Sequence, residues 1–414
     1  MAAFASSSLY PSTTPLQSPL SFSAQLRAVS NNAVSAPAHN LRVVFAAGGT
    51  GGHIYPAIAI ADQLKILNPN AQFLFVGTPT GMEAKAIPSA GFPFTTVPAA
   101  PLARPFLSPR NLFVLPLILT SSVFKNLKIL HEFDPDIVIG TGGFVSFPTC
   151  LAAAIKGVKL LIQEQNSVPG VANLVLSLFA DKICVAFNSS VECFWQRDKC
   201  VVCGNPVRLS LMNNTSKAAA IRHFFRAVEG EKKLVLVLGG SLGANAINIA
   251  LFNVYFQMLS ENEELFIIWQ TGTESFSEME SLVRTHPRLF LSPFLHAVDL
   301  AYAAADLIVS RAGAMTCYEI LATGKPSILI PSPHVAEGHQ FKNAQLMADV
   351  AGSRVIMEDE LDSATLRKAI EEIIDNDNLM QEMSERASRA AKTNASAEIA
   401  ELVISLTTDV DLSS

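Results

Sequence analysis

A run of glycines followed by a histidine is the first feature of this sequence that could do chemistry. Residues 48–52 are Gly-Gly-Thr-Gly-Gly, and His53 comes next, just before a helix that we expect to begin near Pro56. Glycines let the backbone turn tightly and present N–H groups, and a helix N-terminus adds partial positive charge. The loop therefore favours an anion such as a diphosphate. The imidazole of His53 can act there as a base near neutral pH.

The spacing of these glycines argues against two common nucleotide motifs. In a dinucleotide fingerprint counted from Gly49, the third glycine would fall at Ile54, and the next strand ends at Thr78 without an acid for a ribose. No Gly-Lys-Ser or Gly-Lys-Thr closes a phosphate-binding P-loop. NAD and FAD are therefore not expected, and we predict no cofactor.

Two further polar loops follow predicted strands in the same half of the chain. Residues 140–144 are Gly-Thr-Gly-Gly-Phe and follow the strand 136–139. Because ligands of open α/β sheets bind at the carboxyl ends of strands, this loop and residues 48–52 could share one phosphate site. Residues 163–166, Gln-Glu-Gln-Asn, close the strand 159–162 and suit a hydroxyl-rich ligand such as a sugar. The alternative is that they only cap the next helix.

A comparable set of residues occurs in the second half. A strand runs into the glycines of residues 239–243, and residues 310–316, Ser-Arg-Ala-Gly-Ala-Met-Thr, open a helix that carries Glu319. Residues 331–340 complete the set. A loop and a helix N-terminus again favour a phosphate, and the carboxylate of Glu319 could accept two ribose hydroxyls. A nucleotide diphosphate fits this pattern, whereas Glu319 would otherwise be interpreted as a solvated helix acid.

The sequence offers little for metal or nucleophilic chemistry. Cys200 and Cys203 have metal-like spacing but lie in an apolar strand pattern without a second ligand pair, which favours a buried core over zinc. No Gly-x-Ser-x-Gly elbow is present. We predict that no metal is bound.

Short apolar runs that alternate with helical patterns position these loops. They fall at 41–47, 73–77, 137–140, 159–163 and 182–187, and then at 233–238, 265–270, 306–310 and 326–330. This alternation predicts an α/β fold with two doubly wound parallel sheets. We place the linker at residues 204–208. The expected domains are 41–206 and 207–394, followed by a last helix at about 395–408.

Composition agrees with a large folded protein. The chain has 414 residues, of which 50% are hydrophobic and 16% charged, with a net charge of −6. A disordered chain is excluded, and no basic block suggests nucleic acid as a partner. Six cysteines in a chain of this length suit a reducing compartment.

The first 40 residues differ from the rest of the chain. They are rich in Ser, contain Arg27 as their one Lys or Arg, and contain no acid. This composition is typical of an organellar transit peptide and, with so few basic residues, favours a chloroplast. The alternative is a disordered tail that carries no targeting signal.

An apolar segment at residues 112–124 could contact a membrane. It is shorter than the roughly 18–20 residues that span a bilayer, contains Pro116 and has basic residues on both sides. We expect it to lie on a membrane without crossing it, or else to be an ordinary core helix.

Six motifs together, in order from about residue 41 to 405, resemble the MurG family, the UDP-N-acetylglucosamine:N-acetylmuramyl-(pentapeptide) pyrophosphoryl-undecaprenol N-acetylglucosamine transferases. The motifs are residues 48–56, 142–146, 164–166, 204–208, 239–244, and 311–316 with Glu319. The resemblance implies a GT-B fold, in which two Rossmann-like domains face each other across a cleft and the C-terminal helix, at about 395–408, crosses back to join the first domain. It also implies an inverting, metal-independent transfer of N-acetylglucosamine to the 4-hydroxyl of the muramyl sugar of lipid I, which gives the peptidoglycan precursor lipid II.

The resemblance also assigns roles to individual residues. His53 would be the catalytic base and Glu164 the reserve candidate. Donor contacts would come from Thr50, Gly51, Gly52, Asn166, Arg208, Ser241, Leu295, Ala314, Met315, Thr316, Glu319 and Gln340, and acceptor diphosphate contacts from Gly49, Gly142 and Gly143. A membrane patch would include Leu112, Phe113 and Leu117 within residues 102–128. Two positions depart from the family: Gln163 replaces the usual His, and His339 stands where a Gln commonly precedes Gln340.

The expected partners are therefore UDP-N-acetylglucosamine, a lipid-linked muramyl acceptor and a membrane surface. With the leader, the resemblance places a plant plastid-type homologue on the stromal face of the inner chloroplast envelope, bound peripherally. Two alternatives remain: a plastid lipid glycosyltransferase such as a monogalactosyldiacylglycerol synthase, and a non-catalytic partner of an envelope or division complex that retains the fold.

Overall fold

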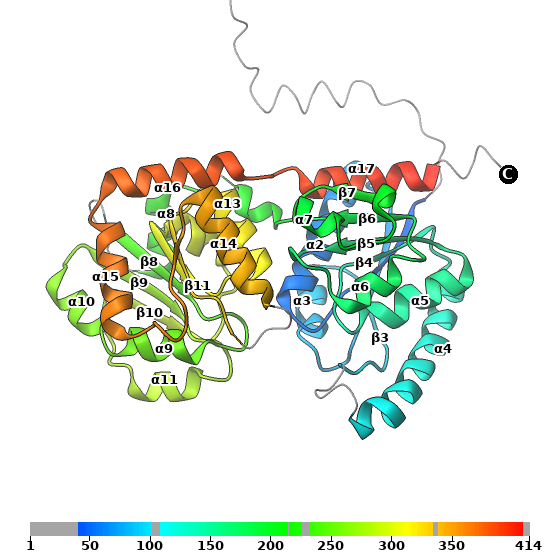
Figure 1. Cartoon of the computed structure of the whole chain (residues 1–414), viewed down its shortest axis with the longest axis horizontal. Helices are drawn as coiled ribbons and strands as arrows, with labels where there is room; N and C mark the ends of the chain where they lie inside the picture. Colours follow the sequence, from blue (N-terminus) through cyan, green and yellow to red (C-terminus); the bar gives the residue numbers. More distant parts are fainter. Residues whose placement is uncertain are drawn as a thin grey trace, which may run out of the picture. The chain divides into compact units, whose positions relative to one another are not determined.

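Two parallel β-sheets organise the chain (Figure 1), and the six strands of the second follow the same order as the first six strands of the other, which has a seventh at its edge. The computed structural model describes residues 40–101, 108–213, 215–225, 230, 232–333 and 338–408. The first sheet has the order β3-β2-β1-β4-β5-β6-β7 and the second β10-β9-β8-β11-β12-β13. In each sheet the order reverses beside its first strand, between β1 and β4 and between β8 and β11. Ligands of open α/β sheets bind at such switch points.

The strands are short and mostly buried on both faces, as parallel strands covered by helices must be. Those of the first sheet are β1 (Arg42–Ala46), β2 (Gln72–Gly77), β3 (Phe94–Thr96), β4 (Ile137–Gly140), β5 (Lys159–Glu164), β6 (Lys182–Val185) and β7 (Cys200–Val202). Those of the second are β8 (Lys233–Leu238), β9 (Leu265–Gln270), β10 (Leu289–Ser292), β11 (Leu307–Ser310), β12 (Ser327–Leu329) and β13 (Arg354–Val355). All nine predicted strands are present.

Helices connect the strands. Around the first sheet they are α2 (Gly51–Leu67), α3 (Glu83–Ser89), α4 (Leu115–Phe133), α5 (Ser146–Lys156), α6 (Val171–Leu176) and α7 (Asn188–Val191). With the second sheet come α8 (Lys217–Phe224), α9 (Asn245–Phe252), α10 (Tyr255–Glu261), α11 (Phe276–Leu282), α12 (Val298–Ala304), α13 (Ala314–Thr323), α14 (His339–Ala351), α15 (Ser363–Ile374) and α16 (Asp377–Ala390). Short helical turns span Arg110–Val114, Arg197–Lys199 and Leu209–Met212.

The prediction that the first helix begins near Pro56 is wrong. Helix α2 begins at Gly51, because the N–H groups of His53 and Ile54 both donate to the carbonyl of Thr50. Pro56 lies inside the helix and removes only one backbone donor. Gly51, Gly52 and His53 therefore form the first turn of α2, with Thr50 as the residue that precedes it.

The last helix, α17 (Ala395–Thr408), belongs to the core of the first sheet. It packs against α2, and Ile399, Ala400 and Val403 are buried in the cluster that contains Phe45 and Ile58. The preceding helix α16 packs instead against α13 and α14. The chain therefore passes from the first sheet to the second after β7 and returns between α16 and α17.

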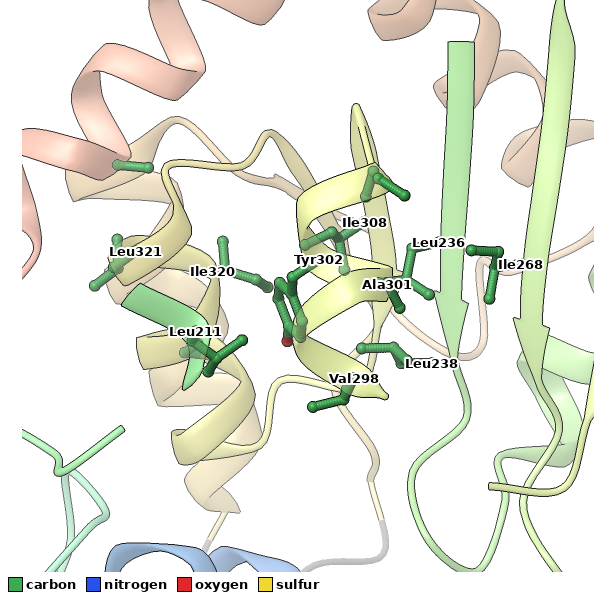
Figure 2. Close-up of a cluster of buried hydrophobic side chains, with 14 of the residues drawn as sticks. Leu211, Leu236, Leu238, Ile268, Val298, Ala301, Tyr302, Ile308, Ile320 and Leu321 are labelled. Carbon is green, nitrogen blue, oxygen red and sulfur yellow. The ribbon is translucent and has the colours of Figure 1, made fainter. Parts of the chain in front are cut away.

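The core of the second sheet surrounds a buried tyrosine. Figure 2 shows Tyr302 of α12 with Ile320 of α13 on one side and Leu236 and Leu238 of β8 on the other. Tyr302 is completely buried. A buried tyrosine needs a partner for its hydroxyl, and the hydroxyl of Tyr302 donates to the carboxylate of Glu319 on α13.

Candidate active site

The two glycine loops of the first sheet meet at its switch point. Gly142 and Gly143 have φ angles of 98° and 81°, which favour glycine. A Cβ atom on Gly143 would lie 2.2 Å from the carbonyl oxygen of Gly48, and one on Gly142 would lie 2.8 Å from His53 Nδ1. Any side chain at either position would separate the loops. The glycines thus serve the close approach of two backbones and of His53.

The backbone donors around this junction differ in availability. The N–H groups of Gly51, Gly52, Gly142 and Gly143 have no acceptor among the described residues. The N–H of Gly49, in contrast, donates to Glu83 Oε2 at 3.1 Å. A diphosphate in this place would find its donors at the start of α2 and in the loop after β4, whereas the predicted donor at Gly49 is already engaged.

Glu83 is a residue that the sequence analysis did not identify. Its carboxylate is completely buried and accepts from Gly49 N, from Thr78 N at 3.0 Å and from the Thr78 hydroxyl at 2.5 Å. A Cβ atom on Gly48, Gly77 or Gly81 would collide with this side chain. Gly48 is distant from Glu83 in the sequence, so no local pattern marked this carboxylate as a support of the loop. Glu83 supports the first glycine loop by accepting the N–H of Gly49 and by packing against Gly48.

His53 is half-buried at the start of α2, with one ring nitrogen engaged. Its Nδ1 lies 3.1 Å from the carbonyl oxygen of Thr141 and 3.2 Å from Gln165 Oε1. Burial lowers the pKa of His53 below its usual 6.5, and the negative charge of Glu164 and the two hydrogen bonds oppose this shift. The ring is therefore neutral at pH 7. Because both atoms facing Nδ1 are acceptors, Nδ1 carries the proton and Nε2 keeps its lone pair.

Glu164, the reserve candidate for the base, has its carboxylate fully engaged. Oε1 accepts from the backbone N–H and the amide of Asn166, at 2.9 and 3.1 Å. Oε2 accepts from Gly170 N at 3.0 Å and from the amide of Asn173 at 2.8 Å. Glu164 is 2% exposed. These contacts shape residues 165–170 before α6 and hold Asn166, and none of them is to a backbone N–H in the first turn of α6.

In the second sheet, the glycine loop after β8 packs against the loop after β9. A Cβ atom on Gly272 would lie 2.1 Å from the Cα of Gly243, so both positions need glycine. Gln270 joins this loop to the predicted donor residue Leu295, because its amide donates to Gly240 O at 2.9 Å and accepts from Leu295 N at 3.1 Å. The backbone N–H of Ser241 has no acceptor among the described residues.

Helix α13 begins at Ala314, within residues 310–316, which the sequence analysis expected to open a helix. Gly313 precedes it without a side-chain cap, and the N–H groups of Ala314, Met315 and Thr316 have no acceptor among the described residues. The first intrahelical bond that closes the turn runs from Cys317 N to Gly313 O. Three free donors at the positive end of a helix suit an anionic group.

Glu319 lies one turn further along α13 and is 6% exposed, so it is not a solvated helix acid. Its Oε1 pairs with Arg208 Nη2 at 3.3 Å, and its Oε2 accepts from the Tyr302 hydroxyl at 3.1 Å. Burial and the adjacent carboxylate of Glu319 raise the pKa of Tyr302 well above 10, so the hydroxyl stays a donor. Two predicted donor residues, Arg208 and Glu319, are thus in contact.

Arg208 also contacts helix α2 of the first domain. Its guanidinium carbon lies 3.8 Å from the centre of the Tyr55 ring on α2, which is a cation–π contact. Tyr55 and Tyr302 were not predicted as site residues, although Tyr55 follows the glycine loop directly. Gln340, another predicted donor residue, accepts from Ser332 N at 2.9 Å, and residues 334–337 lie outside the described residues.

The apolar surface segment forms a longer helix than expected. Arg110–Phe133 is one continuous helix, and by length and composition alone it could cross a membrane. The expectation that this segment is too short to span a bilayer is therefore wrong on length. Leu112, Phe113 and Leu117 are 54%, 71% and 73% exposed. Residues 102–107 of the predicted patch lie outside the described residues.

Comparisons with known proteins agree with the arrangement of loops and helix ends. The chain matches the N-terminal domain of glycosyltransferase family 28 over residues 43–185 and the C-terminal domain of that family over residues 234–403. A UDP-N-acetylglucosamine--N-acetylmuramyl-(pentapeptide) pyrophosphoryl-undecaprenol N-acetylglucosamine transferase of Flavobacterium psychrophilum is 41% identical over 366 residues, covering 88% of this chain and 97% of the relative. The chain belongs to the MurG family. A Thermoanaerobacter relative of the same name is 39% identical and is covered over 100% of its length.

Two solved structures share the fold of this chain. The crystal structure of MurG of Acinetobacter baumannii is similar with a TM-score of 0.64 and 27% identity, over 88% of this chain and 99% of that one. A UDP-N-acetylglucosamine 2-epimerase of Neisseria meningitidis shares the fold at 16% identity and a TM-score of 0.63. The two parallel-sheet domains have the GT-B fold of the MurG family, as predicted.

Proposed function

We propose that this protein transfers N-acetylglucosamine from UDP-N-acetylglucosamine to the 4-hydroxyl of the muramyl sugar of a polyprenyl-diphosphate lipid, with inversion at the anomeric carbon. The observation that carries the proposal is the match over 97–100% of the length of relatives named for this transfer. The contacts of His53 and Glu319 support it. No observation favours a galactolipid synthase or a non-catalytic partner.

Each end of the site has a distinct task in this proposal. UDP binds the second domain, where Glu319 accepts the ribose hydroxyls and the free N–H groups at the start of α13 hold the diphosphate. The loops around Gly51 and Gly142 hold the acceptor diphosphate. His53 Nε2 takes the proton of the acceptor hydroxyl as its oxygen bonds to the anomeric carbon and the bond to UDP breaks. The free helix-end donors stabilise the leaving diphosphate.

The direct test is to incubate the full-length protein with UDP-N-acetylglucosamine or UDP-galactose and with either lipid I or diacylglycerol, and to follow UDP release. We expect turnover only when UDP-N-acetylglucosamine and lipid I are supplied together. The rate should be the same in excess EDTA, because the N–H groups at the start of α13 stabilise the leaving diphosphate in place of a metal. Preference for UDP-galactose and diacylglycerol would support the galactolipid alternative. A rate abolished by EDTA and restored by Mg²⁺ would contradict the metal-independent mechanism.

We also propose that α4 and the turn before it bind a membrane surface. The buried residues of α4 are Ser122, Asn126 and Leu130, whereas Leu117 and Phe124 on the same helix are 73% and 69% exposed. Two of these three buried groups are polar, and large apolar groups in the first half of the helix face outward, which is unusual for a helix that contacts only water. Lys125 and Lys128 lie nearby in the sequence and would attract anionic lipid.

Replacing Phe113 and Leu117 with Ser should weaken binding to vesicles that contain anionic lipid. It should also lower turnover on a membrane-bound acceptor while sparing a soluble acceptor analogue, because only the apolar contact is lost. Sedimentation with vesicles measures the binding. The matched control replaces Ile249 and Leu282, which are 57% and 49% exposed on helices of the second domain, and should leave binding unchanged. Equal vesicle binding by both variants would refute the membrane role of α4.

The leader and the family together support a location in the chloroplast, on the stromal face of the inner envelope. Residues 1–39, which hold nearly all of the predicted transit peptide, lie outside the described residues. Import of a fluorescent fusion that carries residues 1–40 is expected, and a fusion that stays in the cytosol would contradict this location.

A further inference from the structure

A chain of buried amide side chains ends at His53. Asn205, in the linker after β7, accepts from Gln163 Nε2 at 2.9 Å, and Gln163 Oε1 in turn accepts from Gln165 Nε2. Gln165 Oε1 faces His53 Nδ1 at 3.2 Å. Asn205, Gln163 and Gln165 are each no more than 2% exposed, so water does not compete for these contacts. We call these three residues the amide chain.

Backbone carbonyls fix the direction of the amide chain at both ends. Asn205 Nδ2 donates to Gln165 O at 2.9 Å, and a carbonyl can only accept, so Asn205 Oδ1 must point to Gln163. At the other end, Gln165 Nε2 donates to Thr141 O at 2.5 Å, which leaves Gln165 Oε1 for His53. Reversing any one amide would place two donors or two acceptors against each other in a buried place, which is costly.

We propose that the amide chain holds His53 in the tautomer with the proton on Nδ1, and that Gln163 is the positioning residue that transmits this order from Asn205. The inference rests on the proposed role of His53 as the base. Nε2 then keeps its lone pair for the acceptor hydroxyl, and the amide chain acts on the reaction only through His53.

Glutamine suits this position because a neutral amide has one donor end and one acceptor end at every pH. A histidine, which the resemblance to the MurG family leads one to expect at residue 163, could do the same only while neutral. Its protonated ring would donate from both nitrogens, and one N–H would then face Gln165 Nε2. Because Gln163 does not titrate, the direction of the hydrogen bonds in the amide chain does not change with pH.

The first test needs no change to the amide chain. The ring nitrogens of His53 are observed by ¹⁵N NMR in the full-length protein at pH 8, and His53→Gln identifies the signal among the eight histidines. We expect a protonated Nδ1 and an unprotonated Nε2. A proton on Nε2 would overturn the proposal whether or not the enzyme assay succeeds.

The second test is a double-mutant cycle on turnover with a soluble acceptor analogue. Gln163→Leu should lower kcat about tenfold, the scale of one lost hydrogen bond, without changing the affinity for UDP. In the His53→Ala background the same change should have no further effect. Asn126→Leu, which removes another completely buried amide of the first domain, should change kcat by the same factor in both backgrounds.

The outcomes separate the two proposals. If Gln163→Leu lowers kcat equally with and without His53, the amide chain does not act through the base and the inference fails. If His53→Ala keeps full turnover, the proposed base fails, while the NMR result still decides the tautomer. Where Gln163→Leu does not fold, Gln163→His takes its place and should keep the Nδ1–H form of His53 at pH 8; an Nε2–H form in that variant counts against the amide chain.

Discussion

Replacing His53 with alanine is expected to lower kcat by 10²–10⁴-fold and to leave the affinity for UDP nearly unchanged. Proton transfer by a positioned side chain typically contributes that factor, and the Nε2 lone pair of His53 is the one group at the glycine-loop junction that the described contacts leave ready to accept a proton. The predicted donor residues lie mainly on the second domain and should keep their contacts. Steady-state kinetics on a soluble acceptor analogue and calorimetry with UDP measure the two quantities.

The pH profile provides a further check on the same residue. Because burial lowers the pKa of His53 below 6.5, the neutral, active form persists to slightly acidic pH, and kcat should fall only as the pH drops through that lowered pKa. This acid limb should be missing from the residual activity of His53→Ala. Near-normal turnover in His53→Ala would contradict the role of His53 as the base and would favour Glu164. The variant that tests Glu164 is Glu164→Gln, which keeps the shape of the side chain.

Replacing Glu319 with alanine is expected to weaken UDP binding by about ten- to a hundredfold. The carboxylate is assigned the ribose hydroxyls, and a hydrogen bond to a charged group is worth about 1.5–3 kcal/mol. Its loss also leaves the Arg208 guanidinium and the Tyr302 hydroxyl without their shared partner. Calorimetry with UDP measures the change directly.

Two control variants separate the ribose contact from the support of Glu319. Tyr302→Phe removes only the hydroxyl bond to Oε2 and should weaken UDP binding less than Glu319→Ala does. Glu371→Ala removes a surface ion pair with Arg367 on α15 of the same domain and should leave binding unchanged. Calorimetric constants equal to those of the parent protein in Glu319→Ala would remove Glu319 from the UDP site.

The strands and loops that carry the site could be predicted because they coincide with strong local patterns. The continuous apolar runs of β1 and β8 each end in glycines. A Cβ atom on Gly48 would collide with the Glu83 side chain, and one on Gly243 would lie 2.7 Å from the carbonyl oxygen of Thr271. The missed strands β3, β10 and β13 all lie at sheet edges. They are short and only partly buried, so their apolar pattern is weak.

The residues that escaped prediction act through tertiary contacts. Glu83 is a polar residue in a short helix, and only the fold brings its carboxylate under Gly49. Tyr302 has the pattern of a core residue, and its hydroxyl gains meaning only when α12 and α13 place it against Glu319. The direction of the Gln163 amide likewise depends on Asn205, 42 residues away. Local periodicity contains none of this information.

The placement of α17 affects how the protein is made. A ribosome releases the strands of the first sheet before those of the second, and domains usually fold in that order. Here Ile399, Ala400 and Val403 complete the core around β1 and α2, and they are synthesised after the whole second sheet and α16. The N-terminal domain therefore reaches its final packing only after the second domain has been translated, and a nascent chain stalled before residue 395 would leave the face of α2 that contacts α17 exposed to chaperones.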